Sequence, residues 1–272
     1  MIALRFYASG NFLQVIGDTF GVDVATVSRT VTDVTDALFD LKDRAIRFPK
    51  TNIELRATKN GFYALRGFSC VIGCIDGTHV KIIAPGQPDE PAYVNRKRQH
   101  SINVQATCDS KGRFTSINAC WPGSCHDAHV FRCSSLCQHL EGNHQDFEKG
   151  LLLGDSGYPC RPFLLTPYTN PANAKEERYN RSHIATRNLI ERVFGMWKRK
   201  FHVLHSEIRM KPLKASKVIV ACAVLHNLSI LWGEPQDAAD TEDDQPQPDR
   251  YDGPMDGRGV RSHITDTYFN RW

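Results

Sequence analysis

The chain has 272 residues, of which 41% are hydrophobic and 24% are charged. This is the composition of a globular protein, and the chain is long enough to bury a sizeable core. No run of about 18 apolar residues occurs, which argues against a transmembrane helix. The most apolar stretch, 218–232, contains His226 and Asn227 and predicts a buried core helix. The N-terminal sequence MIALRFYASG lacks the pattern of a signal peptide.

Charge is distributed unevenly behind the net value of +4. Between Glu234 and Asp256 there are nine acidic residues and one basic residue; removing them from the totals of 30 and 34 leaves 21 acidic and 33 basic residues, a net of +12. A basic body indicates a polyanionic partner. The acidic, proline-bearing segment can bury little apolar surface, so we expect a disordered tail over 233–272.

The nine cysteines predict a reducing environment. Their number is odd and no secretory signal accompanies them, which indicates free thiols inside a cell. No C-x-x-C pair occurs, so a structural zinc site has little support.

Residues 1–45 have the pattern of short helices. Gly21 ends one helical segment and Asp23 is placed to cap the next, which runs from Ala25. This pattern resembles a helix-turn-helix, although the second helix lacks a cluster of basic residues and a pair that only packs on the body is the alternative. A linker is expected over 46–69. The residues placed to meet DNA are Thr26, Ser28, Arg29 and Thr30.

Strand patterns begin at Cys70. CVIGCI is continuously apolar, as in a strand buried on both faces. SINVQATC and FTSINACW alternate and are joined by the turn sequence DSKG, which predicts a hairpin. LLLGD predicts a fourth strand, and Thr186 to Leu204 has the apolar spacing of a helix. The order predicts an α/β domain over 70–232, with a mixed sheet flanked by helices.

Three carboxylates are expected to converge in this layout. Asp76 ends the first predicted strand, Asp155 ends the fourth, and Glu191 borders the apolar stripe of the long helix. Converging carboxylates favour a divalent cation, and two Mg²⁺ ions about 3.5–4 Å apart can catalyse hydrolysis of a phosphodiester. Each of these residues also has an ordinary explanation when taken alone. IDGT and GDSG are typical turn sequences, and Glu191 can form a helical ion pair with Arg187. The residues alone leave both interpretations open.

Basic residues surround Glu191, where a phosphate backbone would run. They are Arg178, Arg181, His183, Arg187, Arg192, Lys198, Arg199 and Lys200.

Six motifs resemble the DDE endonuclease domain of PIF/Harbinger transposases and the nucleases derived from them. These motifs, in unbroken order over 73–228, are IDGTH, NRKRQHSINVQ, PGSCHDAHVF, GDSGYP, YNRSHIATRNLIERVFGMWK and CAVLHN. The resemblance implies an RNase H-like fold and a catalytic triad of Asp76, Asp155 and Glu191 that binds Mg²⁺ or Mn²⁺. It also implies Asp127 as a metal ligand, for which a capping box with Ser124 is the alternative. Matched positions expected to contact substrate or support the triad are Asn95, Arg96, His100, Tyr179, Asn180, His183 and Arg187.

The first functional hypothesis is a metal-dependent DNA endonuclease in the nucleus, with the cytoplasm as a second location. The resemblance implies a Myb-like DNA-binding partner, and no membrane association is expected. The alternative is a domesticated scaffold that binds DNA or protein without cutting. A phosphatase of the haloacid dehalogenase type would need a nucleophilic aspartate where this chain has Cys74.

Overall fold

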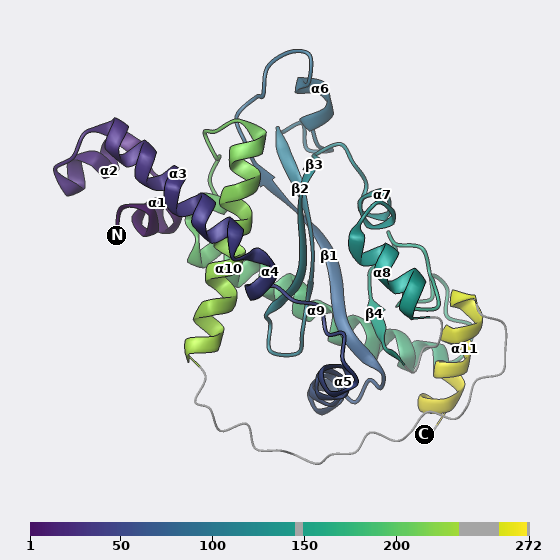
Figure 1. The fold of residues 1–272 in the computed structure, drawn as a ribbon. Coiled ribbons are helices and arrows are strands. Elements are labelled where there is room, and N and C mark those ends of the chain that lie inside the picture. The colour runs from purple at the N-terminus through teal and green to yellow at the C-terminus, as the bar shows by residue number, and fades with distance from the viewer. Residues whose placement is uncertain (145–148, 234–255, 271–272) are drawn as a thin grey trace.

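The computed structural model describes residues 1–144, 149–233 and 256–270. Its centre is a mixed sheet with the strand order β3-β2-β1-β4-β5 (Figure 1). The expected α/β architecture with a mixed sheet is therefore confirmed. The strands are β1 (Val71–Lys81), β2 (Ser101–Cys108), β3 (Phe114–Pro122), β4 (Leu151–Leu153) and β5 (Leu164–Leu165).

Strand β1 is longer than its sequence suggested. It pairs antiparallel with β2 without interruption from Cys74↔Cys108 to Lys81↔Ser101, and it pairs in parallel with the short β4. Asp76 therefore lies inside β1, opposite Ala106, and the expectation that it ends the strand was wrong. The physical reason is that the ladder with β2 satisfies the backbone through IDGTH, where a turn would have left it unpaired.

Helices cover both faces of the sheet (Figure 1). On one face pack α9 (Ala174–Lys200) and α10 (Pro212–Gly233); on the other pack α7 (Asp127–Arg132) and α8 (Ser135–Asn143). Side chains alternate along β1, so Cys74 and Asp76 point towards α9, and the Cys74 thiol contacts the carbonyl of Thr186 at 3.4 Å. Ile75 packs in the α7–α8 cluster, and Gly77 follows it on that face.

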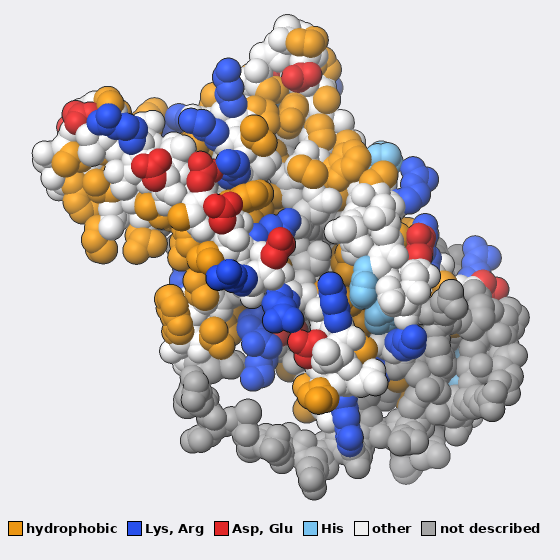
Figure 2. Space-filling view, in the orientation of Figure 1, with side chains coloured by type: hydrophobic (Ala, Val, Ile, Leu, Met, Phe, Trp, Pro, Cys, Tyr) orange, Lys and Arg blue, Asp and Glu red, His pale blue; other side chains and the backbone are white. Residues whose placement is uncertain are grey.

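The N-terminal helices are α1 (Ile2–Ser9), α2 (Leu13–Phe20), α3 (Val24–Asp40) and α4 (Lys42–Ala45). Gly21 ends α2 in the left-handed conformation, and the Asp23 carboxylate accepts a 2.8 Å hydrogen bond from the Thr26 amide, so both predicted helix ends are confirmed. Val27 and Val31 share one hydrophobic core with the sheet. Figure 2 shows further apolar side chains exposed along these projecting helices.

DNA recognition by α3 stays a prediction. Thr26 is occupied, because its hydroxyl donates to Asp23 at 2.6 Å, and Thr30 is half-buried. Ser28 and Arg29 are exposed.

The segment expected to be a linker and the segment expected to be disordered each contain a helix. The expected linker contains α5 (Asn52–Arg66), which begins with a reciprocal capping box between Thr51 and Glu54 and buries Phe62. The expected disordered tail contains α11 (Gly257–Tyr268), whose Val260 and Ile264 are fully buried. Both segments are helical because apolar side chains on one face pack onto the body. The acidic residues 234–255 lie outside the described residues.

Helix α10 fills the core beside β3. Within the described residues it is the one helix whose length and apolar composition would allow it to cross a membrane. However, 56% of its most apolar stretch is buried inside the protein. Residues 218–224 are all buried, which confirms the expected core helix. The remaining elements are α6 (Glu90–Tyr93) and the 3₁₀ helix η2 (His202–Leu204).

Candidate active site

Asp76 is the centre of a cluster of acidic side chains. Its side chain is 14% exposed; one oxygen accepts from the Gly77 amide at 2.8 Å and the other from Nη1 of Arg187 at 3.0 Å. Burial raises the pKa of Asp76 to about 6, although the Gly77 amide and Arg187 oppose this; Asp155 and Asp127 raise it further. Asp76 is therefore held close to other carboxylates despite the cost of their repulsion.

Asp155 and Glu191, the other two residues of the predicted triad, come from the end of β4 and from α9. Asp155 follows β4, the parallel neighbour of β1, and its carboxylate also accepts from the Gly157 amide at 2.9 Å. Glu191 projects from α9 with 52% of its side chain exposed and accepts from Nη2 of Arg187 at 2.7 Å. Asp155 is thus near enough to raise the pKa of Asp76, and Arg187 links Asp76 to Glu191.

Asp127 reaches β1 from the opposite face. Its carboxylate lies where a side chain on Gly77 would be, and it accepts from Nδ2 of Asn103 at 2.8 Å. The capping-box interpretation was wrong: His126 is the N-cap of α7 without a side-chain cap, and the Ser124 amide donates to the carbonyl of Ala92 instead. Asp127 therefore contributes its charge through the sheet, and its role as a metal ligand stays a prediction.

A polar layer that the sequence analysis missed supports Asp127. Nε2 of Gln105 donates to the Tyr158 hydroxyl at 3.0 Å and to the Asp127 carbonyl at 2.9 Å. Burial, followed by Asp127 and Asp76, raises the pKa of Tyr158 well above its ordinary value. The sequence showed polar residues at alternate positions of SINVQATC, but it did not show that β2 is buried along its whole length. These residues are Ser101, Asn103, Gln105 and Thr107.

Lys198 adds a second connection between α9 and β1. Its ammonium donates to the Thr78 hydroxyl and to the His79 carbonyl, both at 2.7 Å. Burial lowers the pKa of Lys198 to about 8, and Lys97 lowers it further. The helix that carries Glu191 is thus tied to the strand that carries Asp76 on both sides of Glu191, by Arg187 and by Lys198.

Most of the expected supporting residues hold connecting segments in place. Tyr179 and His183 are fully buried, so they cannot touch a substrate at the surface. Of the whole set, Arg187 joins the acidic cluster, and Arg96 lies 2.7 Å from His126 at the start of α7. The others form these contacts: Asn95 with Ser101, His100 with Glu90, Tyr179 with Thr166, Asn180 with Tyr168, and His183 with Leu165.

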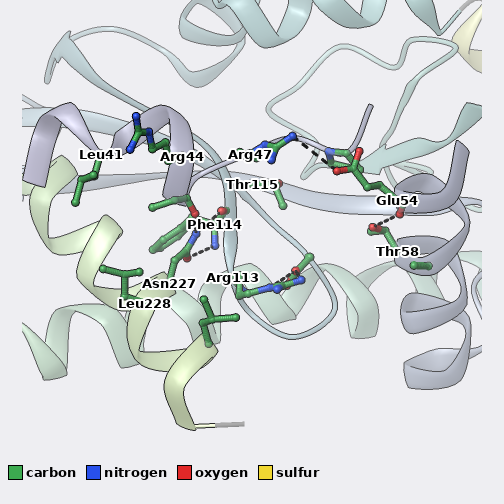
Figure 3. A pocket seen from close by; sticks show the side chains of 15 residues that line it. Leu41, Arg44, Arg47, Glu54, Thr58, Arg113, Phe114, Thr115, Asn227 and Leu228 are labelled. Atoms are coloured by element: carbon green, nitrogen blue, oxygen red, sulfur yellow. Dashed lines mark hydrogen bonds and ion pairs between the residues drawn. The ribbon is translucent and has the colours of Figure 1, made fainter. Parts of the chain in front are cut away.

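A cavity of about 480 Å³ lies away from the acidic cluster, between α4, α5, β3 and α10 (Figure 3). Its wall includes Arg113, and Arg47 lies 4.0 Å from Glu54. None of the predicted triad lines it. The predicted triad therefore lies outside this cavity.

The donor chemistry of the cluster suits a divalent metal ion. Carboxylate oxygens are the ligands that Mg²⁺ and Mn²⁺ prefer. Within the residues that the structure describes, no three acidic, histidine or cysteine side chains are arranged to hold a metal. Instead, the guanidinium of Arg187 is the cation between Asp76 and Glu191. The residues fit such an ion in type and charge, and metal binding would require Arg187 to change partners.

The mixed sheet and its flanking helices are those of an α/β protein with an RNase H-like DDE fold. The family described as "DDE superfamily endonuclease" matches residues 75–227, and the chain belongs to this family. The chain is 39% identical over 244 residues to "Putative nuclease HARBI1" from Homo sapiens, covering 86% of this chain and 69% of that protein. The Mus musculus protein of the same name is 40% identical with the same coverage.

A plant protein is also similar. "Protein ALP1-like" from Arabidopsis thaliana is 29% identical over 265 residues, covering 92% of this chain and 63% of that protein. No solved structure gives a significant match. These comparisons confirm the resemblance to Harbinger-derived nucleases and support a nuclease at the level of the family.

Proposed function

We propose that this protein is a metal-dependent DNA endonuclease in which Asp76, Asp155 and Glu191 hold two divalent ions. The observation that carries the proposal is that Arg187 binds both Asp76 and Glu191, while Asp155, which follows β4, lies near enough to Asp76 to raise its pKa. Holding the buried Asp76 beside Asp155 and Asp127 costs stability, which a protein that only binds would have no need to bear. Asp127 would add charge from the opposite face.

Bound Mg²⁺ or Mn²⁺ would supply an activated water and stabilise the oxygen that leaves the cleaved phosphodiester. The protein's own residues would position the DNA strand. Arg187 would move from the carboxylates to a substrate phosphate, since the planar guanidinium can form paired hydrogen bonds with either a phosphate or a carboxylate. Lys198, fixed against β1, would keep Glu191 and Asp76 in register. Water would be the nucleophile for cutting, and a DNA 3′-hydroxyl for joining if transposition survives.

DNA is the proposed substrate because the chain outside the acidic segment 234–256 carries a large positive charge. A Myb-like protein is the proposed partner, and the nucleus the proposed location with the cytoplasm as a second one. The name of a related nuclease supports the reaction class.

The experiment is nicking of a labelled DNA duplex with Mg²⁺ or Mn²⁺ by the wild type and by Asp155→Asn. The substitution keeps the shape of the side chain and removes its charge. Asp33→Asn, at an exposed position of α3, is the matched control. Metal-dependent cutting that is lost only in Asp155→Asn supports the proposal. No cutting by folded wild-type protein, even with a Myb-like partner added, would leave the non-cutting scaffold as the better account.

A further inference from the structure

Gly195 lies in the middle of α9 without a structural reason to be glycine. A Cβ atom built there would meet nothing within 4 Å, and its backbone angle is one that any residue adopts in a helix. The residue is exposed. Glycine inside a helix is less stable than alanine because it loses more conformational freedom on folding. Alanine at position 195 would therefore give a more stable fold than glycine does.

The neighbours of Gly195 on the helix surface belong to the candidate active site. Residues three and four positions away on a helix lie beside each other. For Gly195 these are Glu191 and Arg192 towards the start of the helix, and Lys198 and Arg199 towards its end. Gly195 is thus an open spot next to the predicted catalytic glutamate, bordered by three cations.

The two arginines beside Gly195 have their charges available. Arg192 and Arg199 are exposed, and neither forms a hydrogen bond or ion pair with any residue in the described part of the chain. Arg181 is exposed and equally unpaired within that part, and lies on the same stripe of the helix surface. From Arg181 to Arg199 the stripe measures about 27 Å at 1.5 Å per residue. That length corresponds to about eight base pairs of duplex at 3.4 Å each.

We infer that a DNA strand crosses α9 at Gly195, with a backbone phosphate resting on the helix between Arg192 and Arg199, beside Glu191. The missing Cβ lets the phosphate approach the helix backbone, as glycine does elsewhere at sites of close backbone approach. The arginine stripe continues the path towards Arg181. This inference rests on the proposed function, because it identifies the surface that presents DNA to the acidic cluster.

The test measures DNA binding separately from cutting. Gly195→Ala and Gly195→Leu are compared with wild type for affinity towards a short fluorescein-labelled duplex in EDTA. Gly142→Ala is the matched control, since Gly142 is also a helical glycine with open space around it, on α8. We expect the melting temperature of the Gly195 variants to equal or exceed that of wild type. Affinity should fall several-fold for alanine and further for leucine, and stay unchanged for Gly142→Ala.

The arginines are tested by the salt dependence of the same binding. Arg192→Ala and Arg199→Ala should each lower the slope of log affinity against log salt by about one, as for loss of one phosphate contact. Arg5→Ala, at an exposed position of α1, should leave the slope unchanged.

Each outcome has a definite reading. Gly195 variants that bind like wild type overturn the inference, even if the wild type cuts DNA, and leave the proposed function standing. A wild type that binds no duplex also overturns it. Loss of binding in the Gly195 variants of a protein that cuts nothing supports the inference and counts against the proposed function.

Discussion

Arg187 donates a 3.0 Å hydrogen bond to Asp76, a residue 111 positions away in the sequence. The two side chains are 15% and 14% exposed, so the pair is largely shielded from water. The same guanidinium holds Glu191. This one side chain therefore both links α9 to β1 and joins two acidic residues of the candidate site.

Arg187→Gln should destabilise the fold. Removing one partner of a largely buried ion pair leaves the other charge without compensation, which costs about 3 kcal/mol. Asp76 would lose its cation while still repelled by Asp155 and Asp127. Urea denaturation at neutral pH measures the effect. Arg192→Gln, five residues further along α9 and exposed, should change stability by less than about 0.5 kcal/mol. Equal losses in both variants would contradict the assigned pair.

His183 should make the fold sensitive to mild acid. Burial lowers its pKa to about 4 from an ordinary value of 6.5, and its ring lies 3.0 Å from the carbonyl of Leu165. The unfolded chain therefore binds a proton at higher pH than the folded chain. The contribution of neutral His183 to the free energy of unfolding is fully present above pH 6.5. It is lost as the pH falls from 6.5 towards 4, by roughly 3 kcal/mol in total.

Thermal melting of the wild type and of His183→Gln across that pH range checks this expectation. The variant should show a flatter dependence on pH, whatever its absolute stability. His205→Gln, at an exposed position, should keep the wild-type dependence. Parallel curves for all three proteins would rule out His183 as the group responsible.

Gly77→Ala should separate Asp127 from β1. The added methyl group would occupy the place of the Asp127 carboxylate, which also binds Asn103. Overpacking of this kind costs about 1–3 kcal/mol. DNA cutting should fall if Asp127 takes part, and a variant that loses stability but retains wild-type cutting at low temperature would remove Asp127 from the site.

Ile264→Ala should show that α11 is part of the folded body. Ile264 is fully buried, and truncation of a buried isoleucine costs about 2–5 kcal/mol. Ile184→Ala, on α9 with Ile184 46% exposed, is the matched control and should cost much less. Similar small losses from both substitutions, measured by urea denaturation, would show that α11 does not contribute to the core.

Local patterns predicted most of the architecture. The alternation in SINVQATC identified β2, and the Asp23 cap identified the start of α3. The helix α5 was missed although Thr51 and Glu54 have the spacing of a capping box. Likewise, the acidic composition of the preceding segment concealed Val260 and Ile264, four residues apart and both buried. In these two cases the signal was present, and average composition outweighed it.

The individual partners of side chains could not be predicted. The sequence predicted that Asp76, Asp155 and Glu191 lie near one another, because strand order and helix packing follow general rules. It did not indicate that Arg187 would bind Asp76, since the helical neighbour Glu191 was the simpler partner. It also did not indicate which side chains of β1 point to which face of the sheet. In the structure, Asp127 and Glu191 lie on opposite faces.

Two further contacts, one near each end of α9, oppose its sliding along its axis and its rotation about that axis. Near its start, Arg178 donates through Nε and Nη2 to the carbonyl of Phe269, at 3.0 and 2.8 Å; near its end, Lys198 donates to β1. A helix held at two separated points on different sides resists both sliding along its axis and rotation about it. The position of Glu191 relative to the sheet therefore depends on attachments on either side of it along α9. A change near the start of the helix, where Arg178 contacts Phe269, would alter the alignment of the acidic cluster without touching any of its members.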